Sequence, residues 1–354
     1  MIQYLKIEGL NGNASSLEFN FNVDLNIFTG LNGCGKTTIL KILWFVNSGF
    51  IDGLLREVHF ESLFLKSDKY EIFIQKDSGG IVLQWKKDNG NSIKRKFPFE
   101  SEGLFRRRDV VEFHNDFEDY GEESLFFPTF RRIEGGFLME SLRYRRYSFP
   151  LKEALFELSE ELSSDKHQFI ASVSTDDITM LLNKEYSTIV REVNEFQKKQ
   201  FEEIKKRIKN KKNKQSDEIL SAIENDINTV EKKQADAMKP FIALEELIMK
   251  IFYKKGIELD MITLGDKINA ISSDKLSAGE KQMLSFLCYN TFSKNKIIFI
   301  DEPELSLHPD WQRLLIPTLL KQGNNNQFFI ATHSPFIYTK YPDKEIAINS
   351  NKGE

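Results

Sequence analysis

The sequence predicts an α/β fold in which a buried parallel sheet is interrupted by a long helical insertion. Two distant segments, Lys296 to Ile300 and Gln327 to Ala331, are mostly apolar, which is typical of strands buried on both faces of a parallel sheet. A third predicted strand, Leu25 to Thr29, leads straight into a glycine-rich loop and then a helix from Thr37 to Phe45. Because these strands lie near opposite ends of the chain, we expect the two ends to form one domain.

The expected domain boundaries follow from the change of pattern along the chain. Residues 1–100 and 265–354 are expected to form the core, with further short strands near the start, and residues 101–264 a mostly helical insertion. Apolar residues recur at helical spacings from about 185 to 255, and polar residues from Asn210 to Ser216 interrupt them. This pattern predicts two long helices, which fit a short antiparallel coiled-coil arm and a bundle packed on the core equally well.

Composition excludes several classes of protein. The 354 residues carry a net charge of −4, so contact with nucleic acid would require local basic patches. Cys34 and Cys288 form no metal-ligand spacing and are expected to be reduced thiols of a cytoplasmic protein. The start lacks the basic stretch and apolar run of a signal peptide, and no run of about 18 apolar residues predicts a membrane span.

The loop from Gly30 to Thr37 fits the phosphate-binding pattern G-x-x-x-x-G-K-[ST] at every position. Its glycines let backbone N–H groups point at phosphate oxygens, and the following helix adds the positive end of its dipole. We expect Lys36 to act on the β- and γ-phosphates as a catalytic residue and Thr37 to bind Mg²⁺. The residues expected to bind nucleotide here are Asn32, Gly33, Cys34, Gly35, Lys36, Thr37 and Thr38.

Three polar residues follow predicted core strands. Asp301 comes directly after an apolar strand, where a second ligand of Mg²⁺ belongs, and the adjacent Glu302 is placed to polarise an attacking water. His333 follows the strand that ends at Ala331, so it is expected at the sheet edge where ligands bind.

A separate motif, Leu276 to Glu280, precedes a helical run from Lys281 to Leu287. Ser277 is expected to cap that helix and Glu280 to complete a capping box. A capped helix start with a hydroxyl and a small glycine is also a preorganised anion site. We therefore expect Ser277, Gly279 and Glu280 to contact nucleotide.

Taken in this order, the motifs resemble those of the ABC-type ATPase heads of the SMC/RecF/OLD group, with AAA_15 and AAA_21 domains among the similar sequences. The resemblance covers residues 1 to about 45 and about 270 to 340. It implies that two heads sandwich two ATP molecules, with Lys36 and Thr37 of one chain facing Ser277 and Gly279 of the other. A homodimer is then the minimum, and higher homo-oligomers stay open. It also implies that Glu302 activates water and that His333 senses the γ-phosphate.

Two further segments bear on this resemblance. The group's glutamine loop has no clear counterpart, and the best candidates are Gln75, which ends a predicted strand, and then Gln84. The stretch Phe126 to Glu134 is similar to one in ATPase subunits of bacterial antiphage systems such as PARIS and Septu. In it, Arg131 or Arg132 could contact phosphate or belong to a basic surface loop.

These patterns predict an ATP hydrolase whose head engagement regulates a separate effector, a nuclease or a toxin, in bacterial antiphage defence. OLD-type proteins carry a nuclease domain after the ATPase, whereas only residues 334–354 follow His333, so we expect the effector to be another chain. The alternative is a DNA-repair or chromosome-maintenance ATPase of RecF/SMC type that binds DNA directly through the basic run Lys205 to Lys214. DNA or a phage protein stays open as a further partner.

Overall fold

The computed structural model describes residues 1–13, 15–77, 79–87, 90, 92–98, 113, 117, 121–129, 132–133, 157–210, 216–252 and 276–348. The chain divides into two compact units. The first unit comprises Met1–Arg132, Leu138–Ser172 and Ser293–Glu354, and the second comprises Ile133–Phe137 and Val173–Phe292. β9 (Arg132–Ile133) pairs with β11 (Ser172–Val173).

A parallel sheet lies at the centre of the first unit. Among the described residues it has six strands in the order β10-β8-β12-β13-β3-β14, and neighbouring strands run parallel throughout. β3, β8, β12 and β13 are buried along their whole lengths, as expected of strands covered on both faces. The strands are β3 (Leu25–Thr29), β8 (Ser124–Phe127), β10 (His167–Phe169), β12 (Ile297–Asp301), β13 (Gln327–Ala331) and β14 (Glu345–Ala347).

An antiparallel sheet in the same unit comes entirely from the start of the chain. Its described strands follow the order β2-β1-β4-β5-β6-β7, and buried residues alternate with exposed ones along most of them. This alternation is typical of a sheet with one face on the core. The strands are β1 (Ile2–Glu8), β2 (Leu17–Asn20), β4 (Ser62–Ser67), β5 (Tyr70–Asp77), β6 (Gly80–Lys87) and β7 (Ser92–Pro98).

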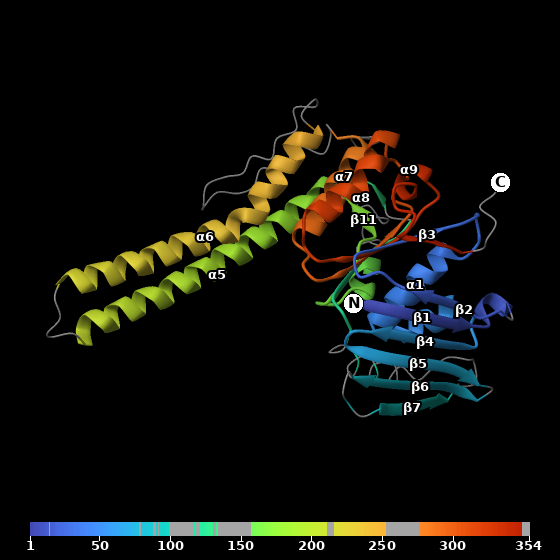
Figure 1. Cartoon of the computed structure of the whole chain (residues 1–354). Coiled ribbons are helices and arrows are strands. Elements are labelled where there is room, and N and C mark those ends of the chain that lie inside the picture. Colours follow the sequence, from blue (N-terminus) through green and yellow to red (C-terminus); the bar gives the residue numbers. More distant parts are fainter. Residues whose placement is uncertain are drawn as a thin grey trace, which may run out of the picture. The chain divides into compact units, whose positions relative to one another are not determined.

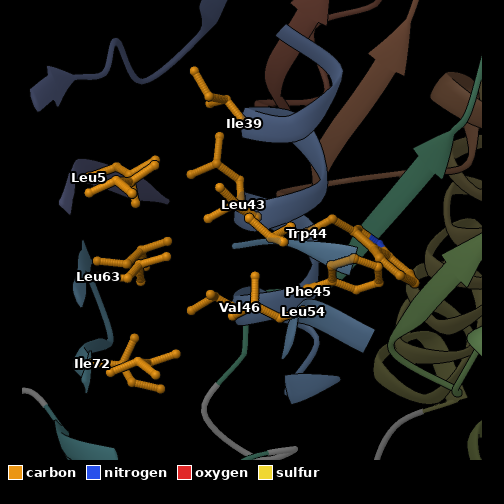
Figure 2. Packing of buried hydrophobic residues seen from close by; sticks show 14 of the residues in the cluster. Leu5, Ile39, Leu43, Trp44, Phe45, Val46, Leu54, Leu63 and Ile72 are labelled. Carbon is orange, nitrogen blue, oxygen red and sulfur yellow. The ribbon is translucent and has the colours of Figure 1, made fainter. Parts of the chain in front are cut away.

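Helix α1 (Lys36–Asn47) forms the apolar centre of the first unit, with α2 (Ile51–Glu57) beside it. Figure 2 shows Ile39, Leu43 and Val46 of α1 turned toward side chains of the antiparallel sheet such as Leu63. The other side of α1 contacts the parallel sheet, where the Trp44 ring lies 5.5 Å from that of Phe126. The helix that begins in the phosphate loop is therefore held by both sheets.

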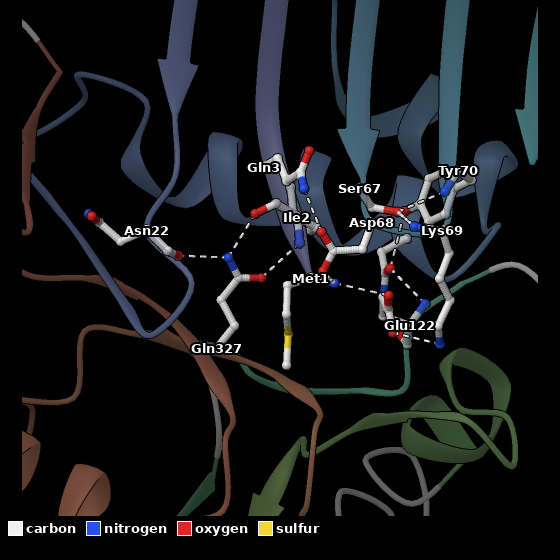
Figure 3. A network of polar contacts seen from close by, with 11 residues as sticks. Met1, Ile2, Gln3, Asn22, Ser67, Asp68, Lys69, Tyr70, Glu122 and Gln327 are labelled. Atoms are coloured by element: carbon white, nitrogen blue, oxygen red, sulfur yellow. Dashed lines mark hydrogen bonds and ion pairs between the residues drawn. The ribbon is translucent and has the colours of Figure 1, made fainter. Parts of the chain in front are cut away.

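Buried polar side chains also join the two sheets (Figure 3). The Gln327 amide, on β13, accepts a hydrogen bond from the Ile2 N–H at 2.8 Å and donates to the Ile2 and Asn22 carbonyls at 2.7 and 2.8 Å. Glu122 lies next to this network and pairs with the Met1 ammonium at 3.0 Å and with Lys69 at 2.7 Å. The buried side chains of Gln327 and Glu122 thus each have partners from other elements.

The second unit is helical. α5 (Thr175–Asn210) and α6 (Ser216–Phe252) lie side by side (Figure 1), and α7 (Ala278–Thr291) contacts both. The break between α5 and α6 falls where the polar stretch predicts it. α5 is about 54 Å long at 1.5 Å per residue over its 36 residues, longer than the spacing of apolar residues indicates.

Burial divides the helical pair into two parts. Near α7 the two helices bury Ile178, Leu182 and Val193 of α5 and Phe241, Leu244, Ile248 and Phe252 of α6. Of the described side chains at residues 194–206 and 224–240, none is buried. The part of the pair nearer the connection therefore has the burial of a two-helix arm, whereas the other part is a packed bundle.

The two units divide the chain differently from the expected boundaries at 100 and 265. β8 and β10 fall inside the expected insertion, yet they are strands of the parallel sheet. β8 pairs with β12 on the side opposite β13, and β10 pairs with β8. Helix α7 follows residue 265 but belongs to the helical unit, since it contacts α5 and α6.

No helix within the described ranges is both long enough and apolar enough to cross a membrane.

Candidate active site

The candidate site lies at the carboxyl edge of the parallel sheet, where four neighbouring strands end. Phe28 of β3 pairs with Ala331 of β13, and Ala331 pairs in turn with Asp301 of β12. Phe127 of β8 pairs with Ile300 of β12. The phosphate loop, His333, the Asp301–Glu302 pair and the segment after β8 therefore leave the sheet side by side, as predicted for the first three.

The phosphate loop has the open backbone of an anion cradle. Gly33 and Gly35 have φ values of 75° and 99°, in the region that favours glycine, and a Cβ at either would meet nothing within 4 Å. Gly35 is the N-cap of α1 and has no side chain, so it leaves the N–H groups of the first turn to a ligand. Lys36 is buried, and its Nζ donates to the carbonyls of Gly30 and Leu31 at 3.2 and 3.1 Å.

Asp301 is held by two hydroxyl groups. The Thr37 Oγ1 donates to Asp301 Oδ1 at 3.1 Å, and the Thr129 hydroxyl donates to Oδ2. Asp301 is only 1% exposed, so these bonds fix a buried carboxylate directly beside the phosphate loop. Thr129 was not predicted as a site residue. The sequence pattern that could have indicated it is a mostly apolar strand, Ser124–Phe127, followed closely by a polar residue, as at Asp301 and His333.

Glu302 and His333 face each other across the ends of β12 and β13. His333 Nε2 lies 3.9 Å from Glu302 Oε1, and their side chains are 33% and 27% exposed. The Glu302 N–H donates to the Ala331 carbonyl at 2.8 Å, and its φ of 45° is uncommon for a residue with a side chain. Burial raises the pKa of Glu302, and the charges of Asp301 and Glu304 raise it further. Glu302 is therefore a stronger base than an ordinary carboxylate.

A cavity of about 430 Å³ adjoins the loop and His333. Its wall includes Thr29, whose hydroxyl donates to Glu345 of β14 at 2.6 Å, and Tyr338 at the end of α9 (Pro335–Tyr338). The full lining is Thr29, Gly30, Leu31, Asn32, Thr332, His333, Tyr338 and Glu345. The site is thus hollowed on the side of the loop that faces His333.

These residues fit ATP with Mg²⁺. The buried Lys36 ammonium donates to the neutral carbonyls of Gly30 and Leu31 beside the open loop. A phosphate anion bound in the loop would supply the negative charge that these carbonyls lack. Thr37 and Asp301 place a hydroxyl and a carboxylate 3.1 Å apart, and Mg²⁺ is usually held by one or two such groups together with phosphate oxygens. Thr37 and Asp301 would therefore hold the metal, which when bound would neutralise charge on the phosphates.

The motif at Leu276 to Glu280 forms the predicted capping box at the start of α7. The Ser277 N–H donates to Glu280 Oε2 at 2.7 Å, and the Glu280 N–H donates to Ser277 Oγ at 3.4 Å. Glu280 is buried and Ser277 is exposed, while Gly279 lies in the first turn. This helix start belongs to the second unit, so its contact with nucleotide stays a prediction.

The structure does not bring the candidate glutamines to the site. Gln75 lies within β5 rather than after it, is exposed, and pairs with Ser62 and Val82 in the antiparallel sheet. Gln84 lies within β6 of the same sheet and donates to Ser92 at 3.0 Å. Arg131 and the side chain of Arg132 lie outside the described part of the chain.

Curated relatives match short parts of the chain. The Retron Ec83 probable ATPase of Escherichia coli is 38% identical over 93 residues, which are 22% of this chain and 17% of that protein. The Septu protein PtuA of Bacillus thuringiensis is 30% identical over 128 residues, 33% of this chain and 32% of PtuA. The aligned regions thus span a third or less of these relatives.

Among solved structures, the Smc head domain of Pyrococcus furiosus bound to the C-terminal domain of ScpA aligns over 96% of this chain and 91% of that chain. The TM-score is 0.41 and the sequence identity is 15%.

A protein family described as "AAA domain, putative AbiEii toxin, Type IV TA system" matches residues 25–338, most of the chain and all four strand ends of the site. The structure confirms the predicted α/β fold, in which a parallel sheet carries the phosphate loop and is interrupted by a helical insertion. The chain belongs to this AAA domain family.

Proposed function

We propose that this chain binds ATP with Mg²⁺ and hydrolyses it. The observation that carries the proposal is the convergence of Lys36, Thr37, Asp301, Glu302 and His333 on one edge of the parallel sheet. A protein that only bound ATP with Mg²⁺ would need Lys36, Thr37 and Asp301 but not the other two residues. Hydrolysis also requires a base for the attacking water, and Glu302, partly buried beside His333, is placed to be that base.

Each residue would have a separate task. The Lys36 ammonium would bind phosphate oxygens, and Thr37 and Asp301 would position the metal. Glu302 would accept a proton from the attacking water, which its raised pKa favours. The His333 imidazole, 3.9 Å from Glu302, would donate a hydrogen bond to the γ-phosphate.

The proposal extends to engagement of two heads and to control of a separate effector in antiphage defence. Ser277 and Gly279 at the start of α7 would complete the site of a second copy, since a capped helix start favours an anion. The similarity to a retron ATPase and to a Septu protein supports a role in defence. The nuclease or toxin would be another chain.

The catalytic assignment is tested by Glu302→Gln in a Mg²⁺-dependent ATPase assay. We expect the rate to fall about 100-fold or more, because the amide cannot accept the proton, while ATP still binds. Glu57→Gln is the matched control, since Glu57 is an exposed carboxylate paired with Lys41 at 2.6 Å. A Glu302→Gln variant that hydrolyses ATP at the wild-type rate would show the assignment to be wrong.

The partner is tested by purifying the chain alone and together with the products of neighbouring genes. A stoichiometric complex with a nuclease or toxin, and sedimentation of Glu302→Gln with ATP as a dimer or larger, would support the proposal. Tight, salt-sensitive DNA binding by the chain alone would favour the repair alternative. Of that alternative's basic run, Lys205 is exposed and pairs with Glu202 at 2.9 Å, and residues 211–214 lie outside the described ranges.

A further inference from the structure

Glu304, three residues after Asp301, links the loop that follows β12 to the loop that follows β13. Its Oε2 accepts a hydrogen bond from the Thr332 hydroxyl at 2.8 Å, and its Oε1 accepts one from the His333 backbone N–H at 2.5 Å. Both carboxylate oxygens are thus engaged by consecutive residues of the histidine loop. Thr332 is fully buried, so its hydroxyl is fixed on a rigid part of the sheet edge.

The surrounding contacts hold the same two loops together. The Ser334 N–H donates to Thr332 Oγ1 at 3.0 Å, and the Ser334 hydroxyl donates to Gln312 Oε1 at 2.6 Å. Gln312, on α8 (Pro309–Lys321), donates in turn to the Leu307 carbonyl at 2.8 Å. The histidine loop is therefore tied at residues 332, 333 and 334 to the segment that carries Glu302.

A carboxylate suits this place better than its amide. Both donors, an O–H and an N–H, point at Glu304, and a carboxylate accepts with either oxygen. A glutamine has one oxygen, so its NH₂ group would face one of the two donors. A hydrogen bond between a backbone N–H and an ionised carboxylate is also stronger than one between neutral groups.

We infer that Glu304 is a positioning residue, which fixes the backbone of His333 so that the imidazole stays opposite Glu302. This inference rests on the proposed ATP hydrolysis. Glu304 is not positioned to take a proton from the attacking water, since its two oxygens already accept hydrogen bonds from the Thr332 hydroxyl and the His333 N–H. Its role is to set the distance between the two groups that act on water and phosphate.

The contact itself is tested by NMR on the full chain without nucleotide. His333 is the only histidine preceded by a threonine, so ¹³C-carbonyl threonine with ¹⁵N-histidine labelling gives one coupled amide signal. We expect that signal to lie downfield in the wild type, because the N–H donates to a carboxylate, and to move upfield in Glu304→Gln. An unchanged signal would overturn the inference.

The role is tested by steady-state ATP hydrolysis with matched variants. We expect Glu304→Gln and Thr332→Val to lower kcat about 10- to 100-fold with little change in KM, because the imidazole is misplaced while the phosphate loop is intact. Thr332→Ser keeps the hydroxyl and should restore kcat. The double variant should lose no more activity than the less active of the two single variants, since both substitutions act on the contact between Glu304 and Thr332. Thr332→Val carries the test if Glu304→Gln does not fold.

The outcomes separate the inference from the proposed function. An active wild type whose kcat is unaffected by Glu304→Gln and Thr332→Val would overturn the inference and leave ATP hydrolysis standing. A rise in KM with unchanged kcat would also overturn it, since the residue would then act on binding. A wild-type chain without ATPase activity would overturn the proposed function, and with it the positioning role.

Discussion

Asp301 illustrates how two side chains fix the orientation of a third. Thr37 and Thr129 donate to different oxygens of its carboxylate, so the group cannot rotate without losing a bond. Thr37 belongs to the phosphate loop and Thr129 follows β8, which makes Asp301 the point where these segments meet. A metal bound between Thr37 and Asp301 would depend on that orientation.

Removing the Thr129 hydroxyl should therefore weaken the proposed metal site. We expect Thr129→Val to raise the Mg²⁺ concentration needed for half-maximal ATPase activity about 10-fold or more, as is typical when a partner of a metal ligand is lost. Thr129→Ser, which keeps the hydroxyl, should behave as the wild type. If the valine and serine variants need the same Mg²⁺ concentration, the hydroxyl does not orient Asp301.

The two cysteines should differ sharply in reactivity. Burial raises the pKa of the Cys288 thiol, whereas Cys34 is partly exposed in the phosphate loop, with Lys36 Nζ 3.8 Å from its sulfur. Because the thiolate is the reactive form, we expect one thiol per folded chain to react with iodoacetamide and two after unfolding. Mass spectrometry should locate the first on Cys34, with protection by ATP. Rapid labelling of Cys288 in the folded chain would contradict this.

At the scale of elements, Gln327 joins β13 to the first strand of the other sheet (Figure 3). Its side chain is fully buried, so replacing it leaves the Ile2 N–H and carbonyl without this partner. We expect Gln327→Met, which keeps the shape, to lower the free energy of unfolding of the first unit by about 2–4 kcal/mol. Urea unfolding followed by tryptophan fluorescence measures this, with the exposed Gln84→Met as control. Equal midpoints for both variants would refute the prediction.

Elements with local signals could be predicted from the sequence. The strand, glycine loop and start of α1, the break between α5 and α6, and the capping box of Ser277 each depend on residues close together in the chain. These signals are short-range because capping, turn chemistry and helical periodicity act over a few residues.

The parts that could not be predicted depend on distant partners. β8 belongs to the parallel sheet because it pairs with β12, and only this pairing brings Thr129 to Asp301, 172 positions away. Gln75 seemed to end a strand, but pairing with β4 and β6 carries β5 on to Asp77 in the antiparallel sheet. A strand followed by a polar residue does not reveal which sheet the strand joins.

At the scale of the whole molecule, the helical unit and the phosphate site should be separable in part. The described side chains of residues 197–206 and 224–234 include no buried one, and the predicted phosphate contacts at residues 30–38 lie in the first unit. We expect a chain in which a short flexible linker replaces residues 197–234 to bind ATP with wild-type affinity in calorimetry. A chain with only residues 211–215 replaced is the control. Loss of ATP binding in the first variant alone would show that the arm supports the site.

The position of β3 between β13 and β14 has a consequence for synthesis on the ribosome. The six described strands of the antiparallel sheet lie within the first 98 residues and can pair early. β3 emerges with them, but its neighbours begin at Gln327 and Glu345, so at 5–20 residues per second it waits on the order of 15–60 s for them. During that interval an apolar strand and its glycine loop are without the sheet that shapes them. The part of the proposed nucleotide site that is translated first is therefore among the last to become able to bind.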